Sequence, residues 1–292
     1  MEQLYHTPDK KKEWNERYYF NFYDPHHETG GFTRIGFKPN IKEGIGYLFL
    51  FYKKEILAFH QRVEGEDVPE IIRTGLLRFT PAWRVTLEAP MKAMDSTTTR
   101  VTLDLMYTPL NTEFSYLDCV STQEFDIGRV VCEDHYEQMG IMEGEITIDS
   151  HTYPISGFSE RDHSWGERDW NTPHLWIYMT AHFNRDFGIN IATMKIDQTQ
   201  IDVGFIMDQG KNIPVTKIYE DTISKGKRQK SFEYTVEDAK GNSYVMTGTV
   251  LKTVQIPYER GGNLSILNEN LSQFTCGDRT GYGTAEYLVR IK

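Results

Sequence analysis

The sequence predicts an all-β fold built from two consecutive antiparallel β-barrels. Apolar and polar residues alternate along many short segments, for example at Val101, Leu103 and Leu105, as they do in half-buried strands. Turn sequences such as DQGKN, DAKGN and ERGGN separate these segments, so neighbouring strands are expected to pair as hairpins. The chain of 292 residues has room for two eight-stranded barrels, because each needs roughly 120 to 160 residues.

The expected elements follow this pattern along the chain. A short helix is expected over residues 8–17, where Thr7 can cap the first turn and Pro8 suits the first helical position. Strands are expected at residues 47–52, 83–87, 101–107, 145–148, 189–196, 232–236, 244–254 and 285–291. Closing such strands into barrels would remove the exposed edges that favour aggregation.

The boundary between the two barrels is expected at Gly157. This gives an N-terminal barrel of residues 1–157 and a C-terminal barrel of residues 158–292. No low-complexity linker separates the halves, so the two barrels are expected to pack together. The boundary opens a segment rich in charged and aromatic residues, GFSERDHSWGERDWNTPHLW, at residues 157–176.

Composition narrows the class of protein. The net charge of −10 is spread without an acidic block, which argues against binding to nucleic acid or to anionic membranes. The three cysteines include no Cys-x-x-Cys pair, so neither a disulfide framework nor zinc or redox chemistry is expected. The first 20 residues carry charges where a signal peptide would need an apolar run. No later segment has the run of about 18 apolar residues that a membrane-spanning helix needs. We therefore expect a cytoplasmic chain without stable membrane insertion.

Alternation within residues 161–165 assigns their side chains to two faces. If this stretch is extended, Arg161, His163 and Trp165 point to one side, and Asp162 and Ser164 point to the other. The consecutive Asp, His and Ser therefore cannot form a catalytic triad, because neighbours in a strand cannot hydrogen-bond in relay.

Two interpretations of this segment stay open. In one, Arg161 and Arg168 pair with Asp162 and Asp169 and fasten one barrel to the next, because buried charges need partners. In the other, His163 lines a cavity and acts as a proton donor or acceptor, since imidazole titrates near neutral pH and a carboxylate can tune it.

A third interpretation is a metal site formed by His163, His174 and His182, with Asp169. These spacings match no compact ligand motif, and we expect no metal. Hydrolase signatures such as Gly-x-Ser-x-Gly and His-Glu-x-x-His are absent from the sequence.

The stretch GFSERDHSWGERDW, residues 157–170, resembles a signature of proteins related to hydroxyneurosporene synthase (carotenoid 1,2-hydratase) and, more distantly, to tocopherol cyclase. Three further stretches look like the same group: FYDPHHETGGFTRIGFKPN near the N-terminus, HYEQMG at residues 135–140, and DRTGYGTAEYL near the C-terminus. Together the four stretches span nearly the full chain.

The resemblance implies a calycin fold of two lipocalin-like β-barrels with a pocket for an apolar molecule. It also implies chemistry without a cofactor: an alkene is protonated, and water or an internal group captures the carbocation. His163 would act as acid or base, with Asp162 or Asp169 to orient or tune it. Glu137 and Glu286 are further candidates for a protonated carboxyl, because burial raises the pKa of a carboxyl group.

The resemblance also places aromatic side chains around the pocket, where their ring faces stabilise a cation. The residues nearest the matching motifs are Tyr23, Trp83, Tyr136, Trp165, Trp176, Tyr178 and Tyr282, and with Glu137 and Glu286 they form the expected substrate-binding set. A structural ion network is expected from Arg34, Arg161, Arg168 and Arg279.

Two functions remain open. The first is an isomerase or lyase, a cofactor-independent cyclase or hydratase for a terpenoid-like or other natural-product substrate. The second is a carrier, because a lipocalin-like barrel binds apolar ligands without any chemistry. An ionisable group with a perturbed pKa against the ligand would favour the enzyme, and apolar walls alone would favour the carrier. The substrate, and whether the chain forms a homodimer, stay open.

Overall fold

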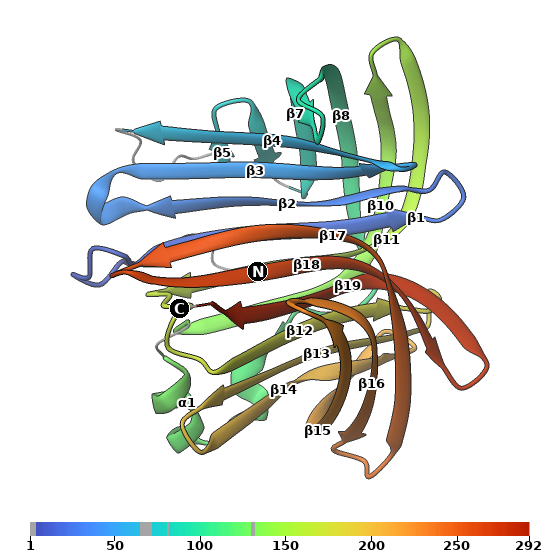
Figure 1. Cartoon of the computed structure of the whole chain (residues 1–292). Coiled ribbons are helices and arrows are strands. Elements are labelled where there is room, and N and C mark those ends of the chain that lie inside the picture. Colours follow the sequence, from blue (N-terminus) through green and yellow to red (C-terminus); the bar gives the residue numbers. More distant parts are fainter. Residues whose placement is uncertain (1–3, 65–71, 81, 130–131, 292) are drawn as a thin grey trace. The chain divides into compact units, whose positions relative to one another are not determined.

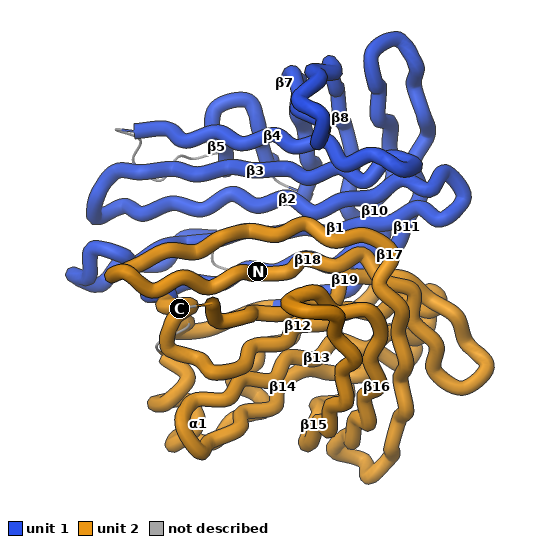
Figure 2. Tube along the Cα trace, viewed as in Figure 1, with its two compact units in different colours: residues 1–109, 137–168 blue, residues 110–136, 169–292 orange. Residues whose placement is uncertain are grey.

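A computed structural model of the chain describes residues 4–64, 72–80, 82–129 and 132–291. Regular structure in this part is almost entirely β-strand, and its single α-helix has seven residues. The chain divides into two compact units, shown in different colours in Figure 2. Unit 1 comprises Met1–Pro109 and Glu137–Arg168, and unit 2 comprises Leu110–Tyr136 and Asp169–Lys292. Within the described ranges, no helix has the length and apolar character needed to cross a membrane.

Unit 1 is built on a sheet that closes on itself. Its strands are β1 (Asn15–Asp24), β2 (Thr29–Lys38), β3 (Glu43–Tyr52), β4 (Glu55–Glu64), β5 (Ile72–Thr74), β6 (Leu77–Thr80), β7 (Arg84–Ala93), β8 (Thr98–Pro109), β10 (Asp134–Ile148), which begins in unit 2, and β11 (His151–Gly166). Neighbouring strands follow the order β4-β3-β2-β1-β11-β10-β8-β7 (Figure 1). A short pairing of Leu57 with Ala93 and of Ala58 with Lys92 joins β4 to β7 and closes this path of strands into a barrel.

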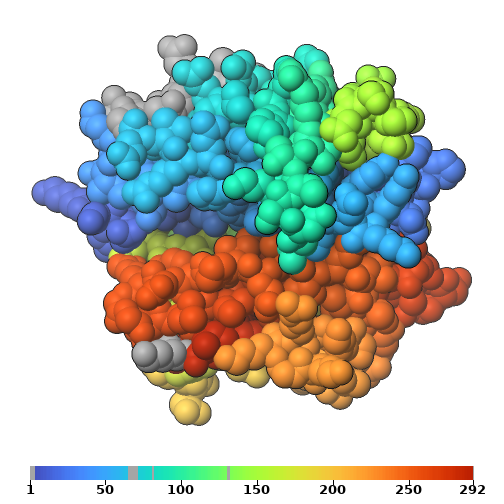
Figure 3. Space-filling model, turned by 45° about the horizontal axis from the view of Figure 1, so that its top comes forward, coloured from blue at the N-terminus to red at the C-terminus, as the bar shows by residue number. Residues whose placement is uncertain are grey.

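Unit 2 contains an up-and-down barrel. Its strands are β12 (Leu175–His182), β13 (Phe187–Ile196), β14 (Thr199–Asp208), β15 (Lys211–Lys225), β16 (Arg228–Asp238), β17 (Ser243–Arg260), β18 (Asn263–Cys276) and β19 (Arg279–Arg290). Each strand pairs with the next, and the pairing of β12 with β19 closes the barrel (Figure 1). Gln209 and Gly210, between β14 and β15, have φ values of +50° and +75°, as a tight type I′ turn requires. The long hairpin of β17 and β18 forms a continuous orange-to-red surface in Figure 3.

The two-residue period of the strands builds a core in each unit. In β8 of unit 1, Val101, Leu103 and Leu105 are buried, and the residues between them face away from the core. In β16 of unit 2, Phe232 and Tyr234 are buried in the same way. The structure thus confirms the predicted all-β fold with two lipocalin-like barrels and the alternation from which it was inferred.

The helix predicted over residues 8–17 is wrong. Residues from Asn15 onward already belong to β1, which pairs with β2 on one side and with β11 on the other. The backbone hydrogen bonds of β1 to both neighbouring strands outweigh the weak local preference for helix that Thr7 and Pro8 create. A short isolated helix has little stability of its own.

The predicted barrel boundary at Gly157 lies inside β11, which runs without interruption from His151 to Gly166. Each compact unit is instead made from two separate segments of the chain. The strand can pass this point because Gly157 has no side chain. A Cβ atom added there would lie 2.4 Å from the backbone oxygen of Tyr23 on the paired strand β1.

The burial of His182, the last residue of β12, predicts that the stability of the folded chain depends on pH. Burial lowers the pKa of His182 to about 3, so the folded chain keeps this imidazole neutral. Below pH 6.5 the imidazole of His182 is protonated in the unfolded chain but stays neutral in the folded chain. The contribution of His182 to the free energy of unfolding is therefore fully present above about pH 6.5. It decreases toward pH 3, by at most about 1.4 kcal/mol per pH unit.

Urea denaturation between pH 4 and pH 7 checks this expectation. The variant His182→Gln should flatten the dependence of the free energy of unfolding on pH. The matched control is His174→Gln, because His174 is exposed and lies just before the same strand. Equal pH slopes in the original chain and in His182→Gln would show that His182 does not control acid stability.

Candidate functional site

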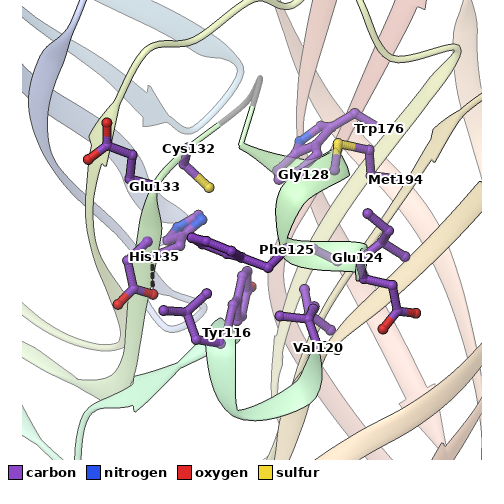
Figure 4. Close-up of a pocket in the computed structure, with 15 residues that line it drawn as sticks. Tyr116, Val120, Glu124, Phe125, Gly128, Cys132, Glu133, His135, Trp176 and Met194 are labelled. Carbon is purple, nitrogen blue, oxygen red and sulfur yellow. Dashed lines mark hydrogen bonds between the residues drawn. The ribbon is translucent and has the colours of Figure 1, made fainter. Parts of the chain in front are cut away.

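Unit 2 contains an apolar pocket against the wall of its barrel (Figure 4). One side is formed by β12, β13 and β14. The other side is formed by the 3-10 helix η2 (Tyr116–Cys119), by α1 (Thr122–Gly128) and by residues 132–135. The cavity itself has a volume of about 70 Å³, which is smaller than a typical small-molecule site, and it opens to solvent.

The strand period explains why this pocket lies outside the barrel. Ile177 of β12 and Ile191 of β13 belong to the barrel core, and their neighbours in sequence point to the opposite face. The strand side of the pocket consists of such outward-facing residues: Trp176, Ala192, Met194, Ile201 and Val203.

The segment that covers the strands is attached to them by side-chain contacts. The Phe114 ring packs against Phe205 of β14, with ring centroids 5.0 Å apart. The Tyr116 hydroxyl donates a hydrogen bond to Oδ1 of Asn190 in β13, over 2.8 Å. These contacts fix η2 on the barrel and place the Tyr116 ring in the pocket wall.

The helix α1 begins with a capping box, which favours a helix at this point of the chain. Ser121 Oγ accepts a hydrogen bond from the backbone N–H of Glu124, and the Glu124 carboxylate accepts one from the backbone N–H of Ser121. The helix carries Phe125 into the pocket, on the side where His135 lies (Figure 4).

Two buried ionisable residues, Asp134 and His135, lie in the pocket wall. The His135 ring centroid is 4.7 Å from that of Tyr116 and 6.5 Å from that of Tyr178. The Asp134 carboxylate accepts hydrogen bonds from Ser115 Oγ at 2.9 Å and from the backbone N–H of His135 at 2.7 Å. Burial nevertheless raises the pKa of Asp134, because it outweighs these two hydrogen bonds, which lower it.

Three residues of the predicted substrate-binding set meet near this pocket. Trp176 lines it and donates a hydrogen bond from its indole N–H to Oε1 of Glu286. Tyr178 pairs with Glu286 across β12 and β19, so the two side chains share the outer face of the barrel. The Trp176 ring also packs edge-on against Trp170, with centroids 5.0 Å apart. The chain therefore brings Trp176, Tyr178 and Glu286 together in unit 2.

His163, the predicted acid or base, lies in unit 1 instead. It is fully buried in β11, opposite Tyr18 of β1, and Tyr18 belongs to the core of unit 1. Paired residues share a face, so His163 points into the interior of this barrel. Its ring stacks on that of Tyr18 at a centroid distance of 4.5 Å and lies 5.4 Å from that of Trp165.

A carboxylate that the sequence did not point to, Glu16, contacts His163. Oε1 of Glu16 lies 2.7 Å from Nε2 of His163 and 2.9 Å from Nδ1 of His6. Burial by itself would raise the pKa of Glu16, but hydrogen bonds with the two histidines outweigh it and hold the pKa below its usual value. Glu16 lies on the same face of β1 as Tyr18 and Phe20. A carboxylate on this aromatic face is the sequence signal that could have pointed to Glu16 as a functional residue.

Arg161 occupies the same interior face of unit 1. Its guanidinium group donates to Oε1 of Gln138, over 3.2 Å from Nε and 3.0 Å from Nη2, and lies 4.6 Å from the centre of the Trp83 ring. The Tyr107 hydroxyl donates to the backbone oxygen of Gln138 at 2.7 Å. The structure therefore brings the predicted residues Arg161 and Trp83 together, through a cation–π contact.

The other predicted residues lie at several places. Asp162 points to the face of β11 opposite to that of His163, and Glu137 is fully buried in β10. Tyr23 in β1 and Tyr136 in β10 are half-buried. The Tyr282 hydroxyl accepts a hydrogen bond from Gln273 at 3.1 Å. Asp169 accepts a hydrogen bond from the backbone N–H of Asn171 and lies 3.9 Å from Arg260.

The predicted ion-network arginines also differ in their surroundings. Arg34 is half-buried in β2, and Arg168 donates to Ser164 Oγ at 3.4 Å. Arg279 is exposed, with its guanidinium 4.5 Å from the centre of the Phe187 ring.

The third interpretation, a shared metal ion, is not compatible with the strand positions of two of its histidines. His174 precedes β12 and His182 ends it, so an extended strand of about 20 Å or more separates them. His174 is exposed, with Nε2 3.7 Å from Oδ1 of Asp197.

Sequence reasoning also missed His135 and Tyr116. His135 opens the stretch HYEQMG, in which only the following Tyr136 and Glu137 were expected to reach a pocket. Tyr116 belongs to a segment without strand alternation, where periodicity gives no information about which side chains face the barrel.

Three solved structures are similar to this chain over nearly its whole length. A protein from Nitrosomonas europaea described as a candidate AttH is 14% identical, with a TM-score of 0.66, and 94% of this chain covers 92% of that one. CghA, solved with Sch210972, is 10% identical with a TM-score of 0.64, covering 96% and 89% of the two chains. Kievitone hydratase from Nectria haematococca is 9% identical with a TM-score of 0.59, covering 94% and 88%. At such identities the likeness shows a common fold.

A search of curated protein sequences gives no match. The sequence pattern of one family, described as a domain of unknown function (DUF7064), matches residues 2–291. This chain is therefore a member of the DUF7064 family.

Proposed function

We propose that this chain is an enzyme of the hydratase or cyclase type that acts on a hydrophobic small molecule bound in the pocket of unit 2. The observation that carries the proposal is the position of His135 and Asp134, two buried ionisable residues, in a largely apolar wall. A carrier needs only apolar walls. Ionisable groups in a pocket, one of them with a raised pKa, are typical of catalytic sites.

The walls of the pocket suit a hydrophobic, alkene-bearing ligand. Met194, Ile201 and Val203 offer apolar surface, and burying apolar surface contributes about 25 cal/mol per Å². The aromatic rings of Tyr116 and Trp176 face the same space. Such rings stabilise a carbocation that forms beside them.

His135 is the group that we assign to proton transfer. An imidazole has two ring nitrogens and can both donate and accept a proton. Asp134 precedes it and has a raised pKa, so a larger share of this carboxyl is protonated in mild acid than in an ordinary aspartate. Protonation of an alkene by His135, followed by capture of the cation by water and loss of one water proton back to the imidazole, gives a hydration. Capture by a group of the substrate itself gives a cyclisation.

Two likenesses support this class of reaction. The fold is similar to that of kievitone hydratase, and CghA shares it and was solved with the small molecule Sch210972. The residues 157–170 resemble the signature of hydroxyneurosporene synthase, which favours a terpenoid-like substrate and chemistry without a cofactor. The catalytic roles of His163, Asp162 and Asp169 stay predictions, and the first two of these residues lie in unit 1.

The substitution His135→Gln tests the proton transfer. We expect turnover of terpenoid polyenes to fall at least about 100-fold, because one general acid or base contributes roughly that much. Binding of farnesol, followed by tryptophan fluorescence, should change less than about threefold, since Gln keeps the polar end of a similar size. Mass spectrometry of the polyenes would detect the gain of one water or the formation of an isomer.

The control is His151→Gln, which changes an exposed histidine in β11 of unit 1 and should leave both turnover and binding unchanged. Unreduced turnover in His135→Gln would contradict the assignment of His135. Farnesol binding without turnover of any polyene in the unaltered chain would favour the carrier instead.

The substitution Met194→Trp tests where the ligand binds. Met194 lies on the outer face of β13, so a larger side chain there fills the pocket and leaves the barrel core unchanged. We expect affinity for farnesol to fall at least about tenfold, because the added ring occupies the space of the ligand. Val245→Trp, at a residue 52% exposed in β17, is the control and should bind farnesol normally. Equal affinities for the two variants would place the ligand elsewhere.

A further inference from the structure

Three side chains of unit 1 converge on a single oxygen atom. Nε2 of His163 and Nδ1 of His6 lie 2.7 Å and 2.9 Å from Oε1 of Glu16. The three residues come from the segment before β1, from β1 itself and from β11. Their ligand atoms all lie within 4.8 Å of one another.

The chemistry of this group is that of a metal site. Two imidazole nitrogens and one carboxylate oxygen form a ligand set that zinc and non-haem iron use in proteins. As a carboxylate, Glu16 would supply the negative charge of the site, because metal ligands bind in their deprotonated form. A divalent cation would neutralise this charge and accept a lone pair from each imidazole.

The spacing of the three atoms requires little adjustment. In a tetrahedral site with metal–ligand distances of about 2.1 Å, two ligand atoms lie about 3.4 Å apart. The two distances to Oε1, 2.7 Å and 2.9 Å, are shorter than this by less than 1 Å. Small rotations of the side chains would open room for an ion.

Neighbouring groups fix the orientation of the three possible ligand side chains. The backbone N–H of His6 donates to the other oxygen of Glu16, Oε2, over 2.9 Å, which leaves Oε1 directed at the two imidazoles. The His6 ring stacks on Trp165 with centroids 3.5 Å apart, and the His163 ring stacks on Tyr18. Such supporting contacts fix ligand planes in metal sites.

The burial of the three residues leaves one side for an ion to enter. The side chains of Glu16 and His163 are 1% and 0% exposed, whereas that of His6 is 17% exposed. His6 precedes β1 in a segment without helix or strand and is the most exposed of the three residues. An ion would therefore enter the site on the side of His6.

We propose that His6, Glu16 and His163 form a binding site for one divalent transition-metal ion of the Zn²⁺ class. The proposal is independent of the pocket in unit 2, because it involves only residues of unit 1. The alternative is a hydrogen-bonded cluster in which protons alone link the histidines to Glu16.

Titration of the full chain with Co²⁺ and Zn²⁺ separates the two possibilities. We expect one Co²⁺ per chain, with visible absorption typical of four ligands, and displacement of Co²⁺ by Zn²⁺. His6→Ala removes a ligand near the surface and should weaken the affinity for Zn²⁺ at least about 100-fold while the circular dichroism spectrum stays unchanged. Glu16→Gln should weaken it as well, although its burial makes it the variant more sensitive to misfolding.

The control is His27→Ala. His27 also lies in unit 1, with Nδ1 2.8 Å from Oδ2 of Asp24, but among the described residues this pair does not belong to a group of three possible metal ligands. Metal affinity should be unchanged in this variant. Binding of less than one Co²⁺ per chain, or equal affinities for His6→Ala and His27→Ala, would overturn the proposal and favour the hydrogen-bonded cluster.

Discussion

The two-residue period of the β-strands is the constraint on which the rest of this structure depends. A strand that contributes every second side chain to a barrel core must present the others to the outside. In β12 the core residue Ile177 therefore places Trp176 on the outer face, where the pocket lies. In β11 the same rule sends Arg161 and His163 into the interior of unit 1, while Asp162 faces away.

The packed cores decide which places remain for a ligand. Large side chains such as Phe232, Tyr234 and Phe274 occupy the core of unit 2. The pocket of this unit therefore forms where η2 and α1 cover the barrel wall without filling the space beneath them. In unit 1 the interior also holds polar residues, and Glu16 and His163 contact each other there, because buried polar groups need partners.

Much of the fold could be predicted because it follows from local pattern. The alternation of Val101, Leu103 and Leu105 and the turn sequences were sufficient for an all-β chain of two barrels. The extended conformation of residues 161–165 and its two faces were predicted in the same way, and β11 confirms them. The helix over residues 8–17 failed because pairing between strands outweighs a local signal.

The candidate sites were less accessible to sequence reasoning, since they depend on contacts between distant residues. Glu16 and His163 are 147 positions apart, and only the register of β1 against β11 brings them together. Asp162, next to His163 in sequence, was expected to tune it, yet adjacent residues of a strand lie on opposite faces. The pocket depends on Tyr116, whose segment has no periodic pattern from which a face could be inferred, and on His135 at the start of β10.

The central claim is that the pocket beside His135 holds the ligand of this protein. A crystal structure of the chain with farnesol bound tests it most directly. We expect density for the hydrocarbon chain against Trp176 and Met194, with its hydroxyl end within hydrogen-bond distance of His135 or Asp134. Density for farnesol elsewhere, with none in this pocket, would contradict the claim.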